Sequence, residues 1–348
     1  MNSISNKKIY VVSAGKKNNG GGETLHQLVD ALNNYSENAY IYYADENLDS
    51  IVYDMRKYNV NLAERIEDDA NNIVICPEMY TKYVSKIKHA RVIIWFLSRD
   101  YYLLSKPEYR TNVLLAKYHV PRIFFPIMYC LTLMFTYASL NTIDIEKAGY
   151  KLYLYNCEYA RLFIESRAKY EHESIYICGP VNEIYYSNYQ EFICEKEPIV
   201  AYNPAKATEY TLKLIDHFAK RQSDVRFIPV TGMPQKKVCE LLKKTSVYMD
   251  LGLFPGPERM PREAALMGCN IIVSYKGSAM NDIDVPIPRK YKFELIEDNL
   301  DAICDAIEEL VKNYNLHFCE YNAYRKKVLV QKGLFDEGVK ELIKRIDG

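Results

Sequence analysis

The stretch 245–278 constrains the fold most, because it reads as strand, loop, helix and strand in close succession. Its first segment, TSVYMDLG, is a mostly apolar run that ends in glycine, as buried parallel strands often do. The loop LFPGPER follows, with two prolines and a glycine that exclude regular structure. Pro261 suits the first helical position, with Arg262 and Glu263 in the first turn. Gly268 suits the C-terminal cap, so the pattern predicts a short helix aimed at the mouth of a sheet.

The start of such a helix carries unpaired N–H groups and a positive dipole end, which stabilise phosphate. A carboxylate there either caps the helix or accepts hydrogen bonds from a ribose. For Glu263 alone, a solvated acid at the helix start is the competing interpretation. The next strand, CNIIVSY, and its turn KGSA bring a second glycine loop to the same edge of the sheet, which favours a nucleotide site.

The amino-terminal strand KIYVVSA leads into a glycine-rich loop and the predicted helix GGETLHQLVDALNNY. Its apolar residues recur at helical spacing: Leu25, Leu28, Val29 and Leu32. A strand, a glycine loop and a helix can hold phosphate, yet neither a Walker motif nor G-x-G-x-x-G spacing is present. A flexible turn with Glu23 as a helix-start acid is the alternative.

Further strands at AYIYYA, NIVICPE and RVIIWFLS alternate with polar and helical stretches. This alternation predicts an α/β protein with a parallel sheet covered on both faces. Glu78 and Asp100 stand at the carboxyl ends of two of these strands, together with Arg99. Either acid could take a proton from an acceptor hydroxyl, or could be a loop acid or a salt-bridge partner.

The longest apolar stretch, 119–140, follows the basic residue Lys117 and includes His119 and Arg122. Pro126 and several hydroxyls interrupt it, and it is too short to be a good spanning helix. The favoured interpretation is a buried core helix of the first domain. The alternative is a helix that lies on a membrane and brings the protein to a lipid-linked acceptor.

Composition narrows the class of protein. The 348 residues suggest about two domains, and a formal net charge of zero gives no sign of nucleic-acid binding. Nine scattered cysteines, without a C-x-x-C pair or metal-ligand spacing, argue against a disulfide framework and predict a reducing, cytoplasmic setting. The amino terminus lacks the apolar core of a signal peptide.

The segment PREAALMGCNIIVSYKGSA resembles the donor-nucleotide segment of GT-B glycosyltransferases, especially the retaining family-four type. In that resemblance Glu263 matches the second acid of the family's pair, which holds the ribose hydroxyls of the sugar nucleotide. The first acid of the pair would fall eight positions earlier, where this chain has Pro255. The nearest acid, Glu258, lies in a differently spaced loop.

Other residues follow from the same resemblance. GGGETLHQLVDAL is similar to the family's GG-x-E loop, and Lys206 matches a lysine set against the donor pyrophosphate. The loop with Thr231 is expected beside the base, and Arg259 is a second phosphate candidate through its fork of donors. The candidate donor-binding set is then Gly21, Gly22, Lys206, Gly232, Met233, Arg259, Arg262 and Glu263. The candidate catalytic set is Lys206 and Arg259 together with the two strand-end acids, Glu78 and Asp100.

The resemblance implies a GT-B fold, with two Rossmann-like, doubly wound domains facing across a cleft. The expected division is an acceptor domain over 1–180, a linker over 181–197, a donor domain over 198–325 and a returning helix over 326–348. The implied function is metal-independent, retaining transfer of a sugar from a nucleotide-sugar to a hydroxyl of a surface glycan or glycolipid, without a further cofactor. The partners are then the sugar donor and a glycan or lipid-linked acceptor, on the inner face of a membrane if 119–140 contacts one.

Two other functions remain open from the sequence. One is a nucleotide-sugar epimerase of the same fold, which changes the donor without an acceptor. The other is a glycan- or nucleotide-sugar-binding subunit with a decayed site, for which Pro255 in place of an acid is the best argument. An inverting mechanism with Glu78 or Asp100 as base is also open.

Overall fold

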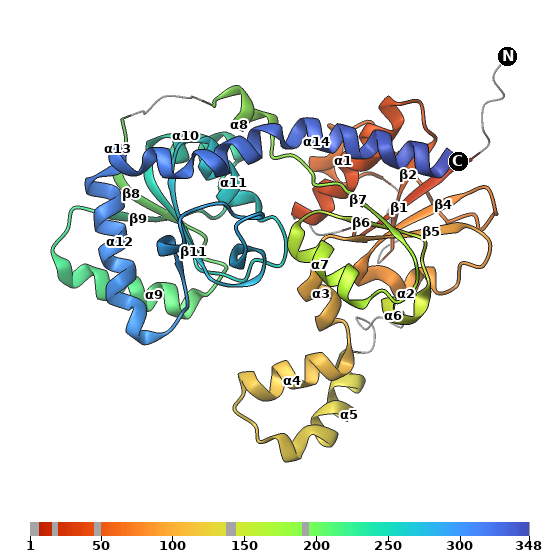
Figure 1. Ribbon diagram of the computed structural model, residues 1–348, viewed down its shortest axis with the longest axis horizontal. Coiled ribbons are helices and arrows are strands. Elements are labelled where there is room, and N and C mark those ends of the chain that lie inside the picture. The colour runs from red at the N-terminus through yellow and green to blue at the C-terminus, as the bar shows by residue number, and fades with distance from the viewer. Residues whose placement is uncertain (1–6, 16–19, 45–49, 137–143, 190–194, 348) are drawn as a thin grey trace. The chain divides into compact units, whose positions relative to one another are not determined.

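The computed structural model describes residues 7–15, 20–44, 50–136, 144–189 and 195–347 (Figure 1). The chain divides into two compact units. Met1–Gly179 together with Leu334–Gly348 forms unit 1, and Pro180–Gly333 forms unit 2. The segment 181–197, expected as a linker, contains helix α8 (Glu183–Ser187) and belongs to unit 2.

Unit 1 is built on a seven-stranded parallel sheet in the order β3-β2-β1-β4-β5-β6-β7. The direction in which strands are added reverses between β1 and β4, which defines a doubly wound sheet with a switch point. Its strands are β1 (Ile9–Ser13), β2 (Ala39–Tyr43), β3 (Asn61–Leu62), β4 (Ile73–Pro77), β5 (Arg91–Phe96), β6 (Leu152–Tyr155) and β7 (Glu173–Tyr176).

Two apolar clusters show that helices cover both faces of this sheet. One face packs on α1 (Gly20–Asn34), whose predicted apolar positions are all buried, and on the last part of α14 (Asn322–Asp347). The other face packs on α7 (Glu158–Arg167). The remaining helices of the unit are α2 (Thr81–Val84), α3 (Arg99–Leu104), α4 (Pro107–Lys117), α5 (Phe125–Thr136) and α6 (Ile145–Ala148), with 3₁₀ turns η1 (Tyr53–Met55), η2 (Glu78–Tyr80) and η3 (Arg122–Phe124).

The expectation that 119–140 is a buried core helix is wrong for its described part. Helix α5 packs against α4, and the Thr111 hydroxyl donates to the Thr132 hydroxyl over 3.1 Å between them. Elsewhere α5 is open, with Ile127 61% and Phe135 79% exposed. An apolar sequence signals burial only where other elements cover it, and here α4 covers one side (Figure 1). Residues 137–140 lie outside the described part.

Unit 2 contains a five-stranded parallel sheet in the order β12-β11-β10-β8-β9. Here the order reverses between β8 and β10, so this sheet is also doubly wound, with its switch point between those two strands. The strands are β8 (Glu197–Tyr202), β9 (Arg226–Pro229), β10 (Thr245–Asp250), β11 (Asn270–Ser274) and β12 (Lys292–Phe293).

Helices on both faces bury this second sheet in a single apolar cluster. They are α9 (Thr208–Phe218), α10 (Gln235–Lys244), α11 (Arg259–Leu266) and α12 (Leu300–Lys312), with α8 and the first part of α14. The short helix α13 (Tyr314–His317) follows α12. The 3₁₀ turns are η5 (Ala219–Arg221), η6 (Gly277–Met280), η7 (Arg289–Tyr291), η8 (Glu297–Asn299) and η9 (Phe318–Tyr321). Helix α14 runs from unit 2 into unit 1, where its residues Phe335, Val339 and Leu342 enter the core.

Candidate nucleotide-binding site

The candidate site lies at the switch point of unit 2, where the chain leaves β8 and β10. Lys206 follows β8, and Asp250 ends β10. After β10 the loop 251–258 leads into α11, which begins at Arg259. In doubly wound sheets, ligands bind outside the carboxyl ends of the strands at this position.

Lys206 is the centre of this arrangement. Its Nζ lies 2.5 Å from Glu258 Oε2, donates to the carbonyl of Leu253 at 3.2 Å and lies 3.7 Å from Asp250 Oδ2. The aliphatic stem crosses the backbone of Gly252, where a Cβ atom would come within 2.3 Å of it. The absence of a side chain at Gly252 therefore allows Lys206 to reach the loop 251–258.

The two acids beside Lys206 differ in their freedom to move. The Asp250 side chain is 1% exposed and its Oδ1 accepts the Gly252 N–H at 3.0 Å, whereas the Glu258 side chain is 22% exposed. Burial raises the pKa of both carboxyl groups, and the charge of Lys206 opposes that rise. Glu258 is thus the partner that an anionic ligand could replace.

Helix α11 begins two residues earlier than the sequence predicts. Glu258 is its N-cap residue, so Pro261 is the third helical residue and Glu263 lies in the second turn. Proline is tolerated there because the first N–H groups of a helix have no partner within it. Gly268 has a φ of 80° just after the helix, as predicted for its C-terminal cap.

Glu263 is buried in unit 2, at 1% exposure, which excludes the interpretation as a solvated helix-start acid. Its Oε1 lies 3.3 Å from Arg259 Nη2. Burial raises the pKa of Glu263, while the charges of Arg259 and Arg262 oppose the rise. Burial raises the pKa of the Tyr185 hydroxyl on α8, and the nearby carboxyl group of Glu263 raises it further. Glu263 is therefore a buried carboxyl group that its neighbours hold in one place.

Arg262 points toward α14 of the same unit. Its Nη1 donates to Gln331 Oε1 at 2.7 Å, and its Nε donates to the Glu258 carbonyl at 3.2 Å. Both Arg262 and Gln331 are buried. This guanidinium fixes the start of α11 to α14, whereas the Arg259 side chain is 21% exposed.

Two further predicted donor residues lie at the same edge of the unit 2 sheet. Gly232 and Met233 follow β9, the neighbour of β8. Gly232 has a φ of 62°, a left-handed conformation that favours glycine, and Met233 is 36% exposed. The structure thus gathers Lys206, Gly232, Met233 and Arg259 at one sheet edge.

In unit 1 the predicted glycine loop is part of a helix. Gly21 and Gly22 lie in the first turn of α1, and the preceding residues 16–19 lie outside the described part. Glu23 is buried and accepts hydrogen bonds from Lys57 Nζ at 2.6 Å and the Tyr58 hydroxyl at 2.7 Å. Its carboxylate therefore secures α1 rather than forming a free helix-start charge.

Glu78 and Asp100 lie at the carboxyl ends of β4 and β5, as predicted, and both are buried. The Leu97 N–H donates to Glu78 Oε2 at 2.8 Å. The Tyr159 hydroxyl donates to Asp100 Oδ1 at 3.2 Å, and burial raises the Asp100 pKa. Asp100 is 8% exposed and Glu78 1%, so Asp100 has more access to a substrate.

The protonation of Glu78 gives a testable pH dependence of stability. Burial raises its pKa from 4.5 to about 8, so the folded protein binds this proton more tightly than the unfolded chain. The resulting stabilisation is fully present below about pH 4.5 and is lost as the pH rises through about 8. Glu78→Gln imitates the protonated acid. We expect it to exceed wild type in unfolding free energy by roughly 4–5 kcal/mol at pH 9 and by less than about 1 kcal/mol at pH 5.

Urea unfolding at pH 5, 7 and 9 measures this difference, followed by the fluorescence of Trp95, the single tryptophan, which lies in the adjacent strand β5. The exposed acid Glu64 supplies the control Glu64→Gln, which removes a carboxyl group that the fold leaves open to water. A difference between Glu78→Gln and wild type that stays constant with pH would contradict the raised pKa of Glu78.

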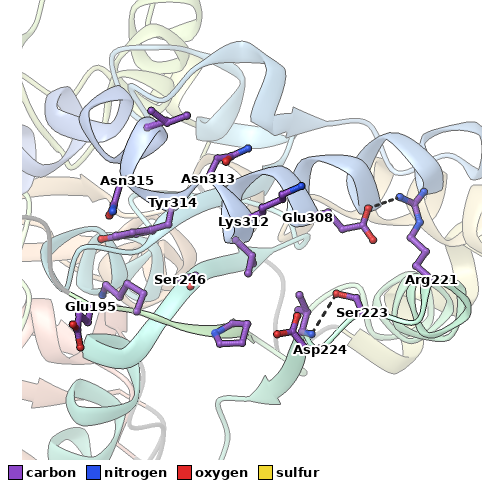
Figure 2. Close-up of a pocket in the computed structure, with 15 residues that line it drawn as sticks. Glu195, Arg221, Ser223, Asp224, Ser246, Glu308, Lys312, Asn313, Tyr314 and Asn315 are labelled. Atoms are coloured by element: carbon purple, nitrogen blue, oxygen red, sulfur yellow. Dashed lines mark hydrogen bonds and ion pairs between the residues drawn. The ribbon is translucent and has the colours of Figure 1, made fainter.

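A hollow of about 1050 Å³ lies at the opposite edge of the unit 2 sheet (Figure 2). Pro198, Val225 and Ser246, at the amino ends of β8, β9 and β10, line it. Figure 2 shows Glu308 and Arg221 joined by an ion pair on its wall, at 3.2 Å. The candidate site with Lys206 lies at the carboxyl ends of these strands, so the length of the strands separates the hollow from it.

Sequence reasoning missed Asp250, which lies beside Lys206 at the end of β10. The rule that selected Asp100, an acid at the carboxyl end of an apolar strand, would also have selected Asp250. No such local rule indicates Gln331, because its contact with Arg262 joins residues 69 positions apart. Among the described residues, no group of three or more His, Cys, Asp or Glu side chains could hold a metal ion.

No protein-family model and no curated protein matches this sequence. Solved structures do match. Sucrose-phosphate synthase from Thermosynechococcus elongatus has a TM-score of 0.62 at 10% identity, over 98% of this chain and 99% of that chain. HepE from Anabaena, in complex with UDP-glucose, has a TM-score of 0.56 at 11% identity, over 97% and 99%. TarM from S. aureus, in a complex that includes UDP, has a TM-score of 0.52 at 13% identity.

The match with TarM covers 81% of this chain and 56% of TarM, so the chain spans little more than half the length of that protein. Together these matches confirm the predicted GT-B fold and the resemblance to GT-B glycosyltransferases. At identities this low, the matches establish the fold and leave the reaction to be argued from the site.

Proposed function

We propose that the protein is a glycosyltransferase that moves a sugar from a nucleoside-diphosphate sugar to a hydroxyl of a glycan or lipid-linked acceptor. The observation that carries the proposal is the position of Lys206 at the switch point of unit 2, in reach of the loop before α11. A cation at this position offsets the charge that develops on the leaving diphosphate. The matches with structures that contain UDP or UDP-glucose support the same class of donor.

Each part of the unit 2 site has a role in this proposal. Lys206 and Arg259 bind the diphosphate, which makes a metal unnecessary for charge compensation. Glu263, held by Arg259, accepts hydrogen bonds from the ribose. The backbone around Gly232 and Met233 lies beside the base.

The stereochemistry is part of the proposal and follows the family-four resemblance. We propose retention of the anomeric configuration. Glu78 is buried and its pKa is about 8, so it is a poor carboxylate base at neutral pH, which leaves Asp100 as the base of an inverting alternative. If Asp100→Asn keeps turnover within a few-fold of wild type, Asp100 is not a base.

A thermal-shift screen against UDP, GDP, ADP, CMP and dTDP tests the donor site, because a ligand that binds only the folded state raises its melting temperature. We expect one diphosphate to stabilise the protein by roughly 2–3 kcal/mol at about 100 times its Kd. Glu263→Gln, which keeps the shape of the buried side chain, should reduce this gain. The matched control Glu240→Gln changes an exposed acid of α10 in the same unit and should leave the gain unchanged.

A failure of all five nucleotides to shift the melting temperature would overturn the proposed donor site. If one nucleotide binds, product analysis with donor alone and with donor plus acceptor decides the reaction. An epimerase would change the donor by itself, and a binding subunit would change neither. Transfer of the sugar to an added acceptor is the result that the proposal requires.

A further inference from the structure

The helical hairpin formed by α4, η3 and α5 carries a concentration of exposed apolar side chains. We call residues 105–135 the basic hairpin. Nine of the large apolar side chains exposed in the described part of the chain belong to it: Tyr109, Val113, Tyr118, Ile123, Phe124, Ile127, Leu131, Met134 and Phe135. The other exposed large apolar side chains of the described residues are spread along the rest of the sequence, between Tyr35 and Leu334. A concentrated patch of this kind marks an interaction surface.

One stripe that begins in η3 and continues along α5 contains four of these side chains. Ile123, Ile127, Leu131 and Phe135 follow one another at intervals of four residues and are 83%, 61%, 39% and 79% exposed. Residues four apart share one face of a helix. The opposite side of α5 carries Thr132, which is buried against α4. The packed side of α5 is therefore occupied, and the apolar stripe is free to meet another surface.

Basic residues accompany this stripe. The basic hairpin contains Lys106, Arg110, Lys117 and Arg122 against the single acid Glu108, and α5 itself has no charged residue. Lys117 and Arg122 lie on either side of the turn that joins α4 to η3 and α5. His119 and Arg122 also line a shallow hollow of about 490 Å³ at this turn, together with Leu115 and Val120. Apolar surface beside positive charge fits an anionic lipid surface.

We propose that the basic hairpin docks on an anionic lipid bilayer, with the exposed stripe of α5 in the boundary between headgroups and acyl chains and Lys117 and Arg122 among the headgroups. The twelve residues of α5 span about 18 Å, against about 30 Å for the hydrocarbon core of a bilayer. The helix therefore lies in the plane of the membrane. No helix among the described residues is long and apolar enough to cross a bilayer.

The position of the basic hairpin within unit 1 connects membrane docking with acceptor binding, an inference that rests on the proposed function. Only Ser105 and Lys106 separate α4 from α3, which begins with Arg99 and Asp100 at the carboxyl edge of the unit 1 sheet. Docking therefore keeps a membrane surface beside the edge where an acceptor would bind. The acceptor hydroxyl then belongs to a molecule embedded in that membrane.

Vesicle flotation of the full-length protein tests the docking without any sugar donor. We expect the protein to float with vesicles of phosphatidylcholine and phosphatidylglycerol, to bind pure phosphatidylcholine more weakly, and to release from anionic vesicles as salt rises. The variant Ile123→Ser/Met134→Ser/Phe135→Ser should weaken binding roughly tenfold or more, because it removes apolar area that enters the bilayer. Lys117→Ala/Arg122→Ala should weaken binding to anionic vesicles alone.

The matched control is Tyr53→Ser/Leu316→Ser, which removes two side chains that are 79% and 75% exposed elsewhere. It should float as wild type does. A second readout places tryptophan on the stripe. Emission of Phe135→Trp should shift to shorter wavelength with anionic vesicles, whereas that of Leu316→Trp should not.

Three results would overturn the docking: no flotation with any vesicle, flotation that the triple variant leaves unchanged, or sedimentation as a dimer that the triple variant abolishes. The last result would make the surface an interface between two copies of this chain. Because the triple variant lies outside the donor site, its thermal shift with the stabilising nucleotide should equal that of wild type. Loss of docking and failure of the proposed transferase function can therefore be distinguished.

Discussion

Lys206→Ala is expected to weaken binding of the preferred nucleoside diphosphate by about 100-fold, whereas Glu258→Gln strengthens it by about tenfold. Both effects follow from the ion pair of 2.5 Å between these side chains. A diphosphate must compete with the Glu258 carboxylate for the lysine, and that carboxylate also repels the ligand. A charge-assisted contact with phosphate contributes roughly 1.5–3 kcal/mol, which is the basis of the larger effect.

Asp250 explains why only one of the two acids should behave in this way. It is almost fully buried at the end of β10, so it cannot move aside, and its attraction keeps Lys206 in position when the ligand arrives. Asp250→Asn is therefore expected to weaken diphosphate binding, opposite in sign to Glu258→Gln. Opposite changes in diphosphate affinity would show that the ligand displaces Glu258, whereas Asp250 holds Lys206 in position.

Isothermal titration of each variant with the diphosphate and with the nucleoside alone measures these effects. The nucleoside lacks phosphate, so its affinity should change little in Lys206→Ala or Glu258→Gln. Lys213→Ala removes an exposed lysine of α9 that pairs with Glu297, and it serves as the control for a lost surface charge. Lys206→Arg should restore part of the affinity. Equal diphosphate affinity in Lys206→Ala and Lys213→Ala would show that Lys206 does not contact phosphate.

The fold was largely predictable because its signals are local. Apart from the two-residue edge strands β3 and β12, strands of four to six residues alternate with helices whose apolar residues share one face. This alternation specifies doubly wound sheets. Lys206 could be selected in the same way, since it follows a strand at the edge where such sheets bind ligands. For the fold, prediction succeeded where one strand or one helix contained the whole signal.

The surroundings of Lys206 were not predictable, because they join distant parts of the chain. Lys206 and Glu258 are 52 positions apart, and only the pairing of β8 with β10 brings them together. The sequence identified Glu258 as a misplaced acid, while the structure makes it the partner of the lysine. Helix α5 was misjudged for the related reason that burial depends on what covers an element. The uncharged sequence of α5 alone does not indicate whether protein, water or lipid surrounds the helix.

Gly277→Ala is expected to lower the unfolding free energy of unit 2 by on the order of 3–5 kcal/mol, through two separate costs. Gly277 has a φ of 62°, a conformation that costs an alanine about 1–2 kcal/mol. In addition, its Cβ atom would lie 2.0 Å from the carbonyl oxygen of Phe254, a backbone atom that cannot rotate away. The neighbouring Ser278 holds the same loop, since its N–H donates to the Phe254 carbonyl and its hydroxyl to the Gly256 carbonyl, each at 2.8 Å.

Two other glycines of unit 2 separate these costs. Gly232 has the same φ of 62° with no atom near its absent Cβ, so Gly232→Ala should cost only the conformational part. Gly333 lies in helix α14 with equally free space, so Gly333→Ala should stabilise the unit by about 0.5–1 kcal/mol. Hydrogen exchange of unit 2 peptides measures all three, because the single tryptophan, Trp95, reports on unit 1.

If Gly277→Ala costs no more than Gly232→Ala, the loop 251–258 yields to the new methyl group. The loop would then also be mobile enough for Glu258 to leave Lys206 when a diphosphate binds. If Gly277→Ala costs more than Gly232→Ala, turn η6 holds the loop 251–258 rigidly. A diphosphate could then replace Glu258 at Lys206 only if the Glu258 side chain rotates by itself.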